Sequence, residues 1–201
     1  HSSLSGAFEA KMRTSKNSLV RVRDVANLVN ERLNPLRMNT PTFHYVEISD
    51  IDSYSNTAIP KEVPTAEAPS RARKVAEFGD VLVSTVRPER GTVGVLMEKA
   101  RPVICTTGLA VLRPQSVSSL TLAMLLKSEF VIEQLVRNNV GIAYPAIEEE
   151  VLPDIVLPVD GEHLRQLDSE AEKVIVAEIE LANLRRALIS NAKEATASWA
   201  A

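Results

Sequence analysis

The end of the chain contains a long stretch without helix breakers. All 7 glycines and all 11 prolines of this 201-residue chain lie at or before Gly161. From Glu162 to Ala197 helix-forming residues dominate, and apolar residues recur at alternating three- and four-residue steps. The sequence therefore predicts one continuous helix over 161–198. A helix of about 30 residues is about 45 Å long, which is longer than a domain of this size can cover.

Apolar residues form two stripes along this predicted helix. The first stripe includes Leu164, Leu167, Ala171, Val174, Leu181 and Leu188, and the second includes Ile175, Ile179, Ala182 and Ile189. Seven-residue spacing is typical of helices that pair as coiled coils. We therefore expect dimerisation through Leu167, Val174, Leu181 and Leu188. The alternative is a helix that folds back on its own domain.

The preceding part of the chain reads as short strands and short helices. Val81–Val86 is an apolar run that ends before Pro88, and Thr92–Met97 follows as a hairpin partner. Residues 103–114 form another apolar run, which Thr106, Thr107 and Gly108 interrupt, as a β-bulge does. Helical spacing appears over Val22–Arg32 and again over Val117–Val136. Residues 53–70 are rich in Ser, Asn, Thr and Pro, which favours a loop.

These patterns predict the α+β class: a small, mixed, β-rich domain with short helices, followed by the long C-terminal helix. We expect a tag or flexible leader over 1–18, the β-rich domain over 19–160 and the helix over 161–198. No apolar run reaches the ~18 residues of a membrane span. Cys105 is the only cysteine, so an internal disulfide is excluded. This composition suits the reducing cytoplasm, where we expect the protein.

Positive charge is concentrated although the net charge is −3. Residues 11–37 contain seven Lys and Arg and two acidic residues, and residues 71–113 contain eight Lys and Arg and four acidic residues. Five of these cations flank the predicted strand Val81–Val86: Arg71, Arg73, Lys74, Arg87 and Arg90. One basic face of this kind can bind nucleic acid. Ordinary solvated surface charge is the alternative at this point.

Catalytic signatures are absent from the sequence. The three histidines lack metal-ligand spacing, and no glycine-rich phosphate loop follows a strand. Cys105 has no sequence partner for nucleophilic chemistry and is expected in the core. We therefore predict no catalytic residue, no metal and no cofactor. A nuclease or methyltransferase remnant, the competing interpretation, would require a carboxylate cluster or a cofactor loop.

Four segments resemble a known family when they are taken in order. They are YVEISDID (45–52), SRARKVAEFGDVLVSTVRP (70–88), ICTTGLAVLRP (104–114) and GIAYPAI (141–147). Together they are similar to the target-recognition domains of specificity subunits from type I restriction-modification systems. The predicted helix over 162–197 resembles the spacer helix that follows such a domain. The resemblance covers roughly residues 20–197.

This resemblance implies sequence-specific recognition of double-stranded DNA without catalysis. It also implies partners: methyltransferase (modification) subunits that methylate adenine at N6, and a motor-nuclease (restriction) subunit. Such subunits carry two recognition domains and two paired helices, whereas this chain has one of each. It therefore resembles a half-subunit that forms a homodimer through its helix, or a fragment. A recognition tail of a fused restriction-methyltransferase, or an assembly scaffold that does not bind DNA, are the alternatives.

The DNA-facing residues are predicted from charge and position. Arginine suits bidentate contacts with guanine, and cations on loops reach phosphates. The predicted set is Arg71, Arg73, Lys74, Arg87 and Arg90, with Thr106, Thr107 and Tyr144 as polar readers. Three alternatives stay open. Arg87 braces the hairpin, the two threonines belong to a bulge, or Tyr144 packs against the domain.

Overall fold

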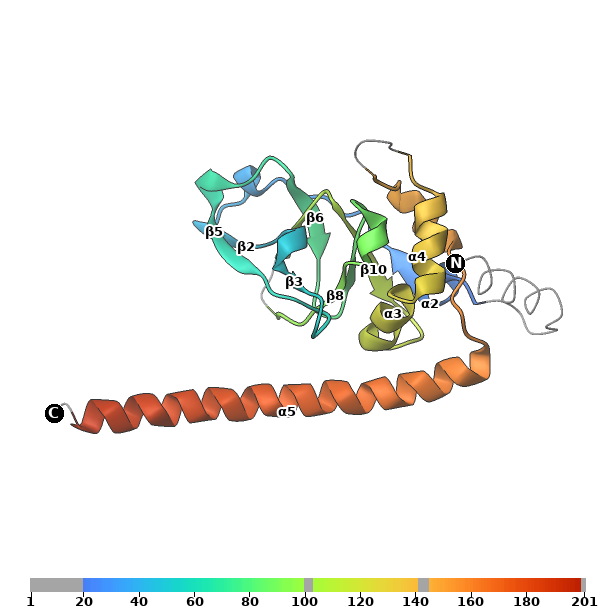
Figure 1. The fold of residues 1–201 in the computed structure, drawn as a ribbon. Helices are drawn as coiled ribbons and strands as arrows, with labels where there is room; N and C mark the ends of the chain where they lie inside the picture. The colour runs from blue at the N-terminus through green and yellow to red at the C-terminus, as the bar shows by residue number, and fades with distance from the viewer. Residues whose placement is uncertain (1–19, 100–102, 141–144, 200–201) are drawn as a thin grey trace.

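The computed structural model describes residues 20–99, 103–140 and 145–199, and it contains two β-sheets, short helices and one long helix (Figure 1). The six-stranded sheet has the order β1-β10-β7-β8-β4-β3, and the four-stranded sheet has the order β5-β2-β9-β6. The strands of the six-stranded sheet are β1 (Ala26–Leu28), β10 (Leu109–Pro114), β7 (Val81–Ser84), β8 (Val93–Leu96), β4 (Thr57–Ala58) and β3 (Ile51–Asp52). The strands of the four-stranded sheet are β5 (Lys61–Pro64), β2 (Thr42–Val46), β9 (Val103–Thr106) and β6 (Ala72–Ala76).

Helices α2 (Val22–Val25), α3 (Ser119–Leu126) and α4 (Glu129–Arg137) lie on one side of the six-stranded sheet, and the four-stranded sheet lies on the other (Figure 1). The long helix α5 (Gly161–Trp199) runs past both sheets (Figure 1). Five 3₁₀ turns complete the described structure: η1 (Pro35–Arg37), η2 (Ile48–Asp50), η3 (Thr65–Glu67), η4 (Pro88–Arg90) and η5 (Glu149–Asp154). The expected α+β class with a long C-terminal helix is confirmed.

Strand β7 shows why three consecutive residues, Val81 to Val83, are apolar. Val81 and Val83 pack toward the helices, whereas Leu82 packs between the two sheets. A strand that is covered on both faces needs apolar side chains at odd and even positions alike. The same division holds in β10, where Ala110 and Leu112 face the helices. These two neighbouring strands therefore form the centre of the core.

Gly94 in β8 marks the closest approach between two strands of this sheet. A Cβ atom at this position would lie 2.8 Å from Cγ2 of Ile51 and 3.3 Å from the backbone nitrogen of Ala58. Both neighbours belong to the short β3–β4 hairpin, which continues the sheet beyond β8. Glycine is therefore required here so that this hairpin can lie against the sheet.

Three predicted elements differ from the structure. The expected helix over Val22–Arg32 is one turn, because the chain from Ala26 onward pairs with β10 as strand β1. The helical stretch over Val117–Val136 divides into α3 and α4, since Ser128 accepts the N–H of Val131 and starts a new helix. The expected loop over 53–70 contains β4 and β5.

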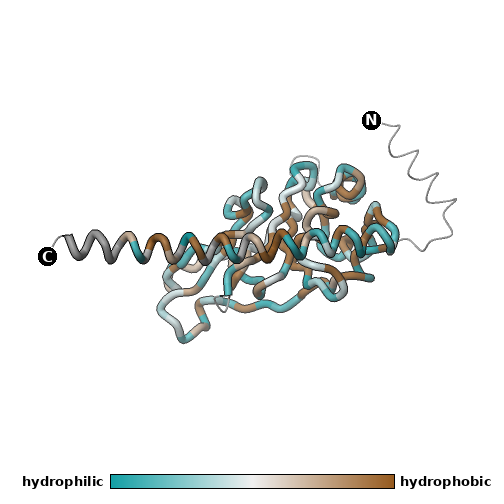
Figure 2. The backbone as a smooth tube through the Cα atoms, turned by 90° about the horizontal axis from the view of Figure 1, so that it is seen from below, coloured by the Kyte–Doolittle hydropathy of each residue, from teal (hydrophilic) through white to brown (hydrophobic). Residues whose placement is uncertain are grey.

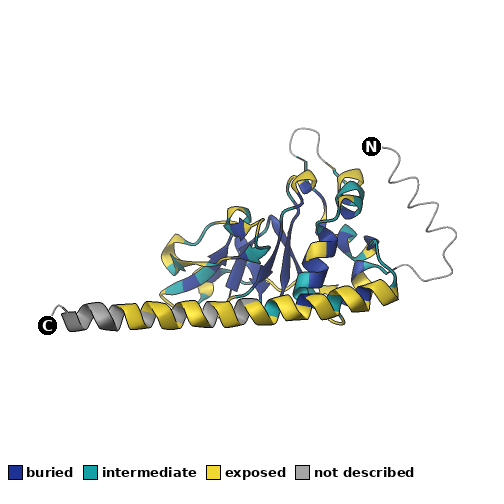
Figure 3. Cartoon of the chain, turned by 60° about the horizontal axis from the view of Figure 1, so that its bottom comes forward, coloured by how far each residue is buried: buried dark blue, intermediate teal, exposed yellow. Residues whose placement is uncertain are grey.

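Among the side chains that the structure describes, helix α5 contacts the rest of the protein through its first part. Leu164 and Ala171 are buried, and the backbone N–H of Ser118 donates to Oδ1 of Asp168 at 2.5 Å. After Ile175, the side chains that the structure describes are exposed, as the yellow surface of the helix shows (Figure 3). Apolar and polar positions still alternate along that exposed part (Figure 2).

No helix among the described residues is long and apolar enough to cross a membrane.

Candidate functional site

Arg71 and Thr107 meet where β6 begins and β9 ends. The guanidinium Nε of Arg71 donates to Oγ1 of Thr107 at 3.2 Å, and the Thr107 N–H donates to the Arg71 carbonyl at 2.9 Å. Gly108 makes room for this contact, since a Cβ there would lie 3.3 Å from Nη2 of Arg71. The turn between β9 and β10 therefore supports an exposed arginine.

Strand β7 ends beside the same turn. The backbone N–H of Thr85 donates to the carbonyl of Gly108 at 3.0 Å, and its hydroxyl donates to the same oxygen at 3.1 Å. Val86 also borders Gly108, where a Cβ would lie 3.5 Å from Cγ2 of Val86. The loop that follows Val86 thus begins next to Arg71 and Thr107.

That loop carries the other two exposed arginines, Arg87 and Arg90. Pro88, between them, is buried, and a Cβ at Gly91 would lie 2.7 Å from Cδ1 of Ile132 in α4. The loop therefore packs against α4. We call Arg71, Thr107, Arg87 and Arg90 together the arginine surface.

Electrostatics favour an anion at the arginine surface. Its three guanidinium groups form no ion pair with any residue that the structure describes, and Glu89 is the acid within the loop itself. Guanidinium groups hold their charge at all physiological pH values. The arrangement can therefore bind phosphate oxygens or acceptor groups on base edges.

Lys74 lies elsewhere, which corrects its predicted role in DNA contact. Its side chain is buried, and its ammonium group bonds the carboxylate of Glu149. Arg32 adds a second cation, with Nη2 at 3.5 Å from Oε1 of Glu149. A buried charge needs an opposite charge beside it, and strand β6 supplies Lys74 for this purpose. Lys74 therefore stabilises the body and does not face a ligand.

Arg73 and Thr106 form hydrogen bonds within the body of the protein. Arg73 is half-buried, and its Nη1 donates to the backbone carbonyl of Ala72 at 2.6 Å. Thr106 is buried, and its side chain hydrogen-bonds Tyr45, which opposes the rise in the pKa of Tyr45 caused by burial. The expectation that Thr106 reads DNA therefore conflicts with its position inside the sheet. Tyr144 lies outside the described residues.

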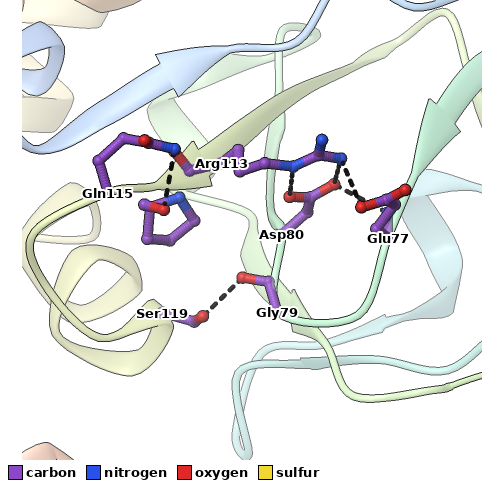
Figure 4. Close-up of polar contacts among 7 residues, drawn as sticks. Glu77, Gly79, Asp80, Arg113, Gln115 and Ser119 are labelled. Atoms are coloured by element: carbon purple, nitrogen blue, oxygen red, sulfur yellow. Dashed lines mark hydrogen bonds and ion pairs between the residues drawn. The ribbon is translucent and has the colours of Figure 1, made fainter.

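A second cluster of charged residues surrounds Asp80 (Figure 4), and the sequence analysis did not predict it. Asp80 is buried and receives Nε and Nη2 of Arg113, each at 2.9 Å, together with the Glu77 N–H at 2.8 Å. The cluster lines an open cleft of about 400 Å³ that also borders Ile175 of α5. Because Asp80 is already bonded on both oxygens, it closes the turn before β7 and offers no free carboxylate for catalysis. The guanidinium group of Arg113 is likewise already paired with the carboxylate of Asp80.

The described part of the chain contains no group of three or more His, Cys, Asp or Glu side chains that could hold a metal ion.

Two solved structures match this arrangement of sheets and helix. A chain from a structure on complex assembly and conformational transition of the type I restriction-modification system has a TM-score of 0.67 and 30% identity, and covers 86% of this chain. The HsdS subunit from Thermoanaerobacter tengcongensis has a TM-score of 0.64 and 31% identity, and covers 84%. The chain has the fold of a type I specificity subunit's target-recognition domain. No protein-family model and no curated protein matches it.

The resemblance seen in the sequence is thus confirmed, and it extends to half of a specificity subunit. This chain spans 45% and 44% of the lengths of the two matched chains. The target-recognition domain is followed by a single long helix, α5. The four residues expected to mediate dimerisation, Leu167, Val174, Leu181 and Leu188, are all exposed on this helix.

Cys105 of the target-recognition domain lies in the core between the sheets, and burial raises the pKa of its thiol from 9.0 to about 12. At pH values between 9.0 and about 12, the thiol is deprotonated in the unfolded chain and still protonated in the folded chain. The free energy of unfolding therefore falls as the pH rises through this range. We expect Cys105 to lower the free energy of unfolding by about 1.4 kcal/mol per pH unit in this range. Chemical denaturation of the protein and of Cys105→Ala from pH 8 upward measures the difference. Identical pH profiles would contradict this prediction.

Proposed function

We propose that this chain recognises one half of a bipartite sequence in double-stranded DNA, as the specificity component of a type I restriction-modification system. The arginine surface carries the proposal, because three exposed guanidinium groups gather on turns that the β-core holds in place. Phosphate contacts position a protein on the duplex and base contacts specify the sequence. Residues 19–160 form the recognition unit, and 161–198 form the spacer.

The chain itself is not an enzyme in this proposal. It directs partner methyltransferase subunits to an adenine, whose N6 they methylate, and it directs the motor-nuclease subunit to unmodified sites. Two carboxylates inside the body, those of Asp80 and Glu149, are buried and already paired with cations. The proposed DNA contacts therefore supply binding and not bond cleavage.

A homodimer through α5 completes the proposed subunit. Leu167, Val174, Leu181 and Leu188 follow one another at seven-residue intervals, and this line lies about 40–160° around the helix from Leu164, Asp168 and Ala171, which contact the body. A second α5 can therefore pack on the line without displacing the body. Two chains of this length also restore the length of the matched subunits.

Removing a phosphate-binding arginine is expected to weaken DNA binding in a salt-dependent way. Arg71→Ala and Arg90→Ala should each reduce the slope of log K against log salt concentration by about one, because each lost contact releases one fewer counterion. Fluorescence anisotropy with a labelled duplex, at several salt concentrations, measures the slope.

Arg37→Ala is the matched control, since Arg37 is an exposed arginine on η1, outside the arginine surface. It should leave the slope unchanged. Equal slopes for all variants and the unmodified protein would show that DNA binds elsewhere. An assembly scaffold that does not bind DNA predicts no salt-dependent binding at all.

A further inference from the structure

Arg87 adopts a backbone conformation that an arginine rarely takes. Its φ is 52° and its ψ is 61°, in the left-handed region. That region brings Cβ close to the following carbonyl oxygen and costs free energy for every residue except glycine. The loop uses glycine for the same conformation at its other end, where Gly91 has φ 57° and ψ 37°. An arginine at the first position is therefore not explained by the turn alone.

The surrounding structure holds Arg87 in this conformation. Its N–H donates to the carbonyl of Pro145 at 2.8 Å, and its own carbonyl accepts the N–H of Arg90 at 3.0 Å. Just before it, Val86 forms a β-bridge with Ala146, and the Ile147 N–H donates to the Thr85 carbonyl at 2.9 Å. The backbone on both sides of Arg87 is thus bonded, so its Cα–Cβ direction is set.

The side chain of Arg87 takes no part in holding the loop. It is exposed, and among the described residues it has no hydrogen bond and no ion pair. Bracing of the hairpin by the guanidinium group, one of the interpretations of the sequence, is therefore not seen in this part of the structure. What the strained backbone sets is the Cα–Cβ direction along which the exposed Arg87 side chain leaves the loop.

Resting on the proposed function, we propose that Arg87 is the specificity-determining residue of the arginine surface and reads a guanine in the major groove. A phosphate contact tolerates variation in direction, because a cation is attracted from many sides. Two parallel hydrogen bonds to O6 and N7 of guanine require the planar guanidinium at a set angle. Strained residues persist where such geometry matters. Arg71 and Arg90, on ordinary backbone, contact phosphates.

Two substitutions of Arg87 separate strain, charge and base reading. Arg87→Gly removes the strain and the side chain, and Arg87→Lys keeps the charge without the fork of donors. The full chain and each variant are used to enrich duplexes from a randomised double-stranded library at low salt, and the selected sequences are compared. Arg37→Lys is the control and should select the same sequence as the unmodified protein.

We expect the unmodified protein to select a motif with a guanine at one defined position. Both Arg87 variants should lose the preference for guanine at that position. Affinity for the unmodified protein's best duplex should fall about 5- to 150-fold, with the salt slope of Arg87→Lys unchanged. The melting temperature of Arg87→Gly should rise by about 2–4 °C.

Three results would overturn the proposal, and they are distinguishable. If Arg87→Lys selects the unmodified motif, Arg87 contacts phosphate, while the proposed function stands. If Arg87→Gly melts at a lower temperature, the backbone at this position is not strained. If the unmodified protein enriches no sequence, the proposed function itself fails.

Discussion

Replacing Leu181 and Leu188 together with Asp is expected to convert a dimer into a monomer while the β-rich body stays folded. Both side chains lie on the exposed part of α5 that follows Ile175, and they are 47% and 69% exposed. Pairing with a second helix would bury them, and each buried leucine contributes about 1.5–3 kcal/mol. Two lost leucines alone then weaken the dimer by at least 100-fold.

The aspartates add a further cost, because a carboxylate without a partner is strongly disfavoured inside an apolar interface. The body is unaffected, since the contacts with α5 that the structure describes extend no farther than Ile175, six residues before Leu181. Light scattering measures the mass in solution, and circular dichroism reports the fold.

Val176→Asp with Ala187→Asp is a matched control. Both residues are exposed on α5 and lie roughly 100–140° around the helix from Leu181 and Leu188. This variant carries the same added charge and should remain a dimer. A monomeric mass for the unmodified protein, or a dimer that survives in both double variants, would contradict pairing through this stripe.

Replacing Lys74 with Met is expected to lower the free energy of unfolding by about 3–5 kcal/mol, because Glu149 is left buried without its main partner. The side chain of Lys74 is 4% exposed and that of Glu149 is 10% exposed. Arg32 lies farther away, and its side chain is 60% exposed, so it replaces only part of the lost attraction. A loss of this size is a large fraction of the stability of a typical domain, about 5–15 kcal/mol.

A double variant and a control at a neighbouring position test whether the pair is the cause. Lys74→Met with Glu149→Leu removes both charges, and replacing a buried pair by apolar residues is often neutral, so this variant should regain most of the loss. Arg73→Met, the neighbouring position on β6, should cost less than about 1 kcal/mol, as half-exposed cations without an acid partner do. Urea denaturation measures all four proteins. Similar stabilities for Lys74→Met and Arg73→Met would contradict a buried ion pair.

The sequence predicted well the elements whose signals are local. The absence of Gly and Pro after Gly161 was sufficient to predict α5, and the apolar run within Val81–Val86 predicted a strand that ends before Pro88. The stretch after Val22 failed for the opposite reason. Its apolar spacing fits a helix, but pairing with β10, more than 80 residues later, pulls Ala26–Leu28 into a strand.

The candidate site shows the same division. Composition identified a basic segment around β7, and the order of short motifs identified the family, because both are properties of the chain read in one direction. Which cations are free was decided by residues distant in sequence. Lys74 is neutralised by Glu149, 75 positions away, and Arg113 is bound to Asp80, whereas Arg87 is held by the backbone of Pro145 with its side chain left exposed. Charged residues can be counted from a sequence. Which acid neutralises a cation, and which backbone conformation a loop arginine adopts, depend on contacts between distant residues, and these contacts form only when the sheets pack.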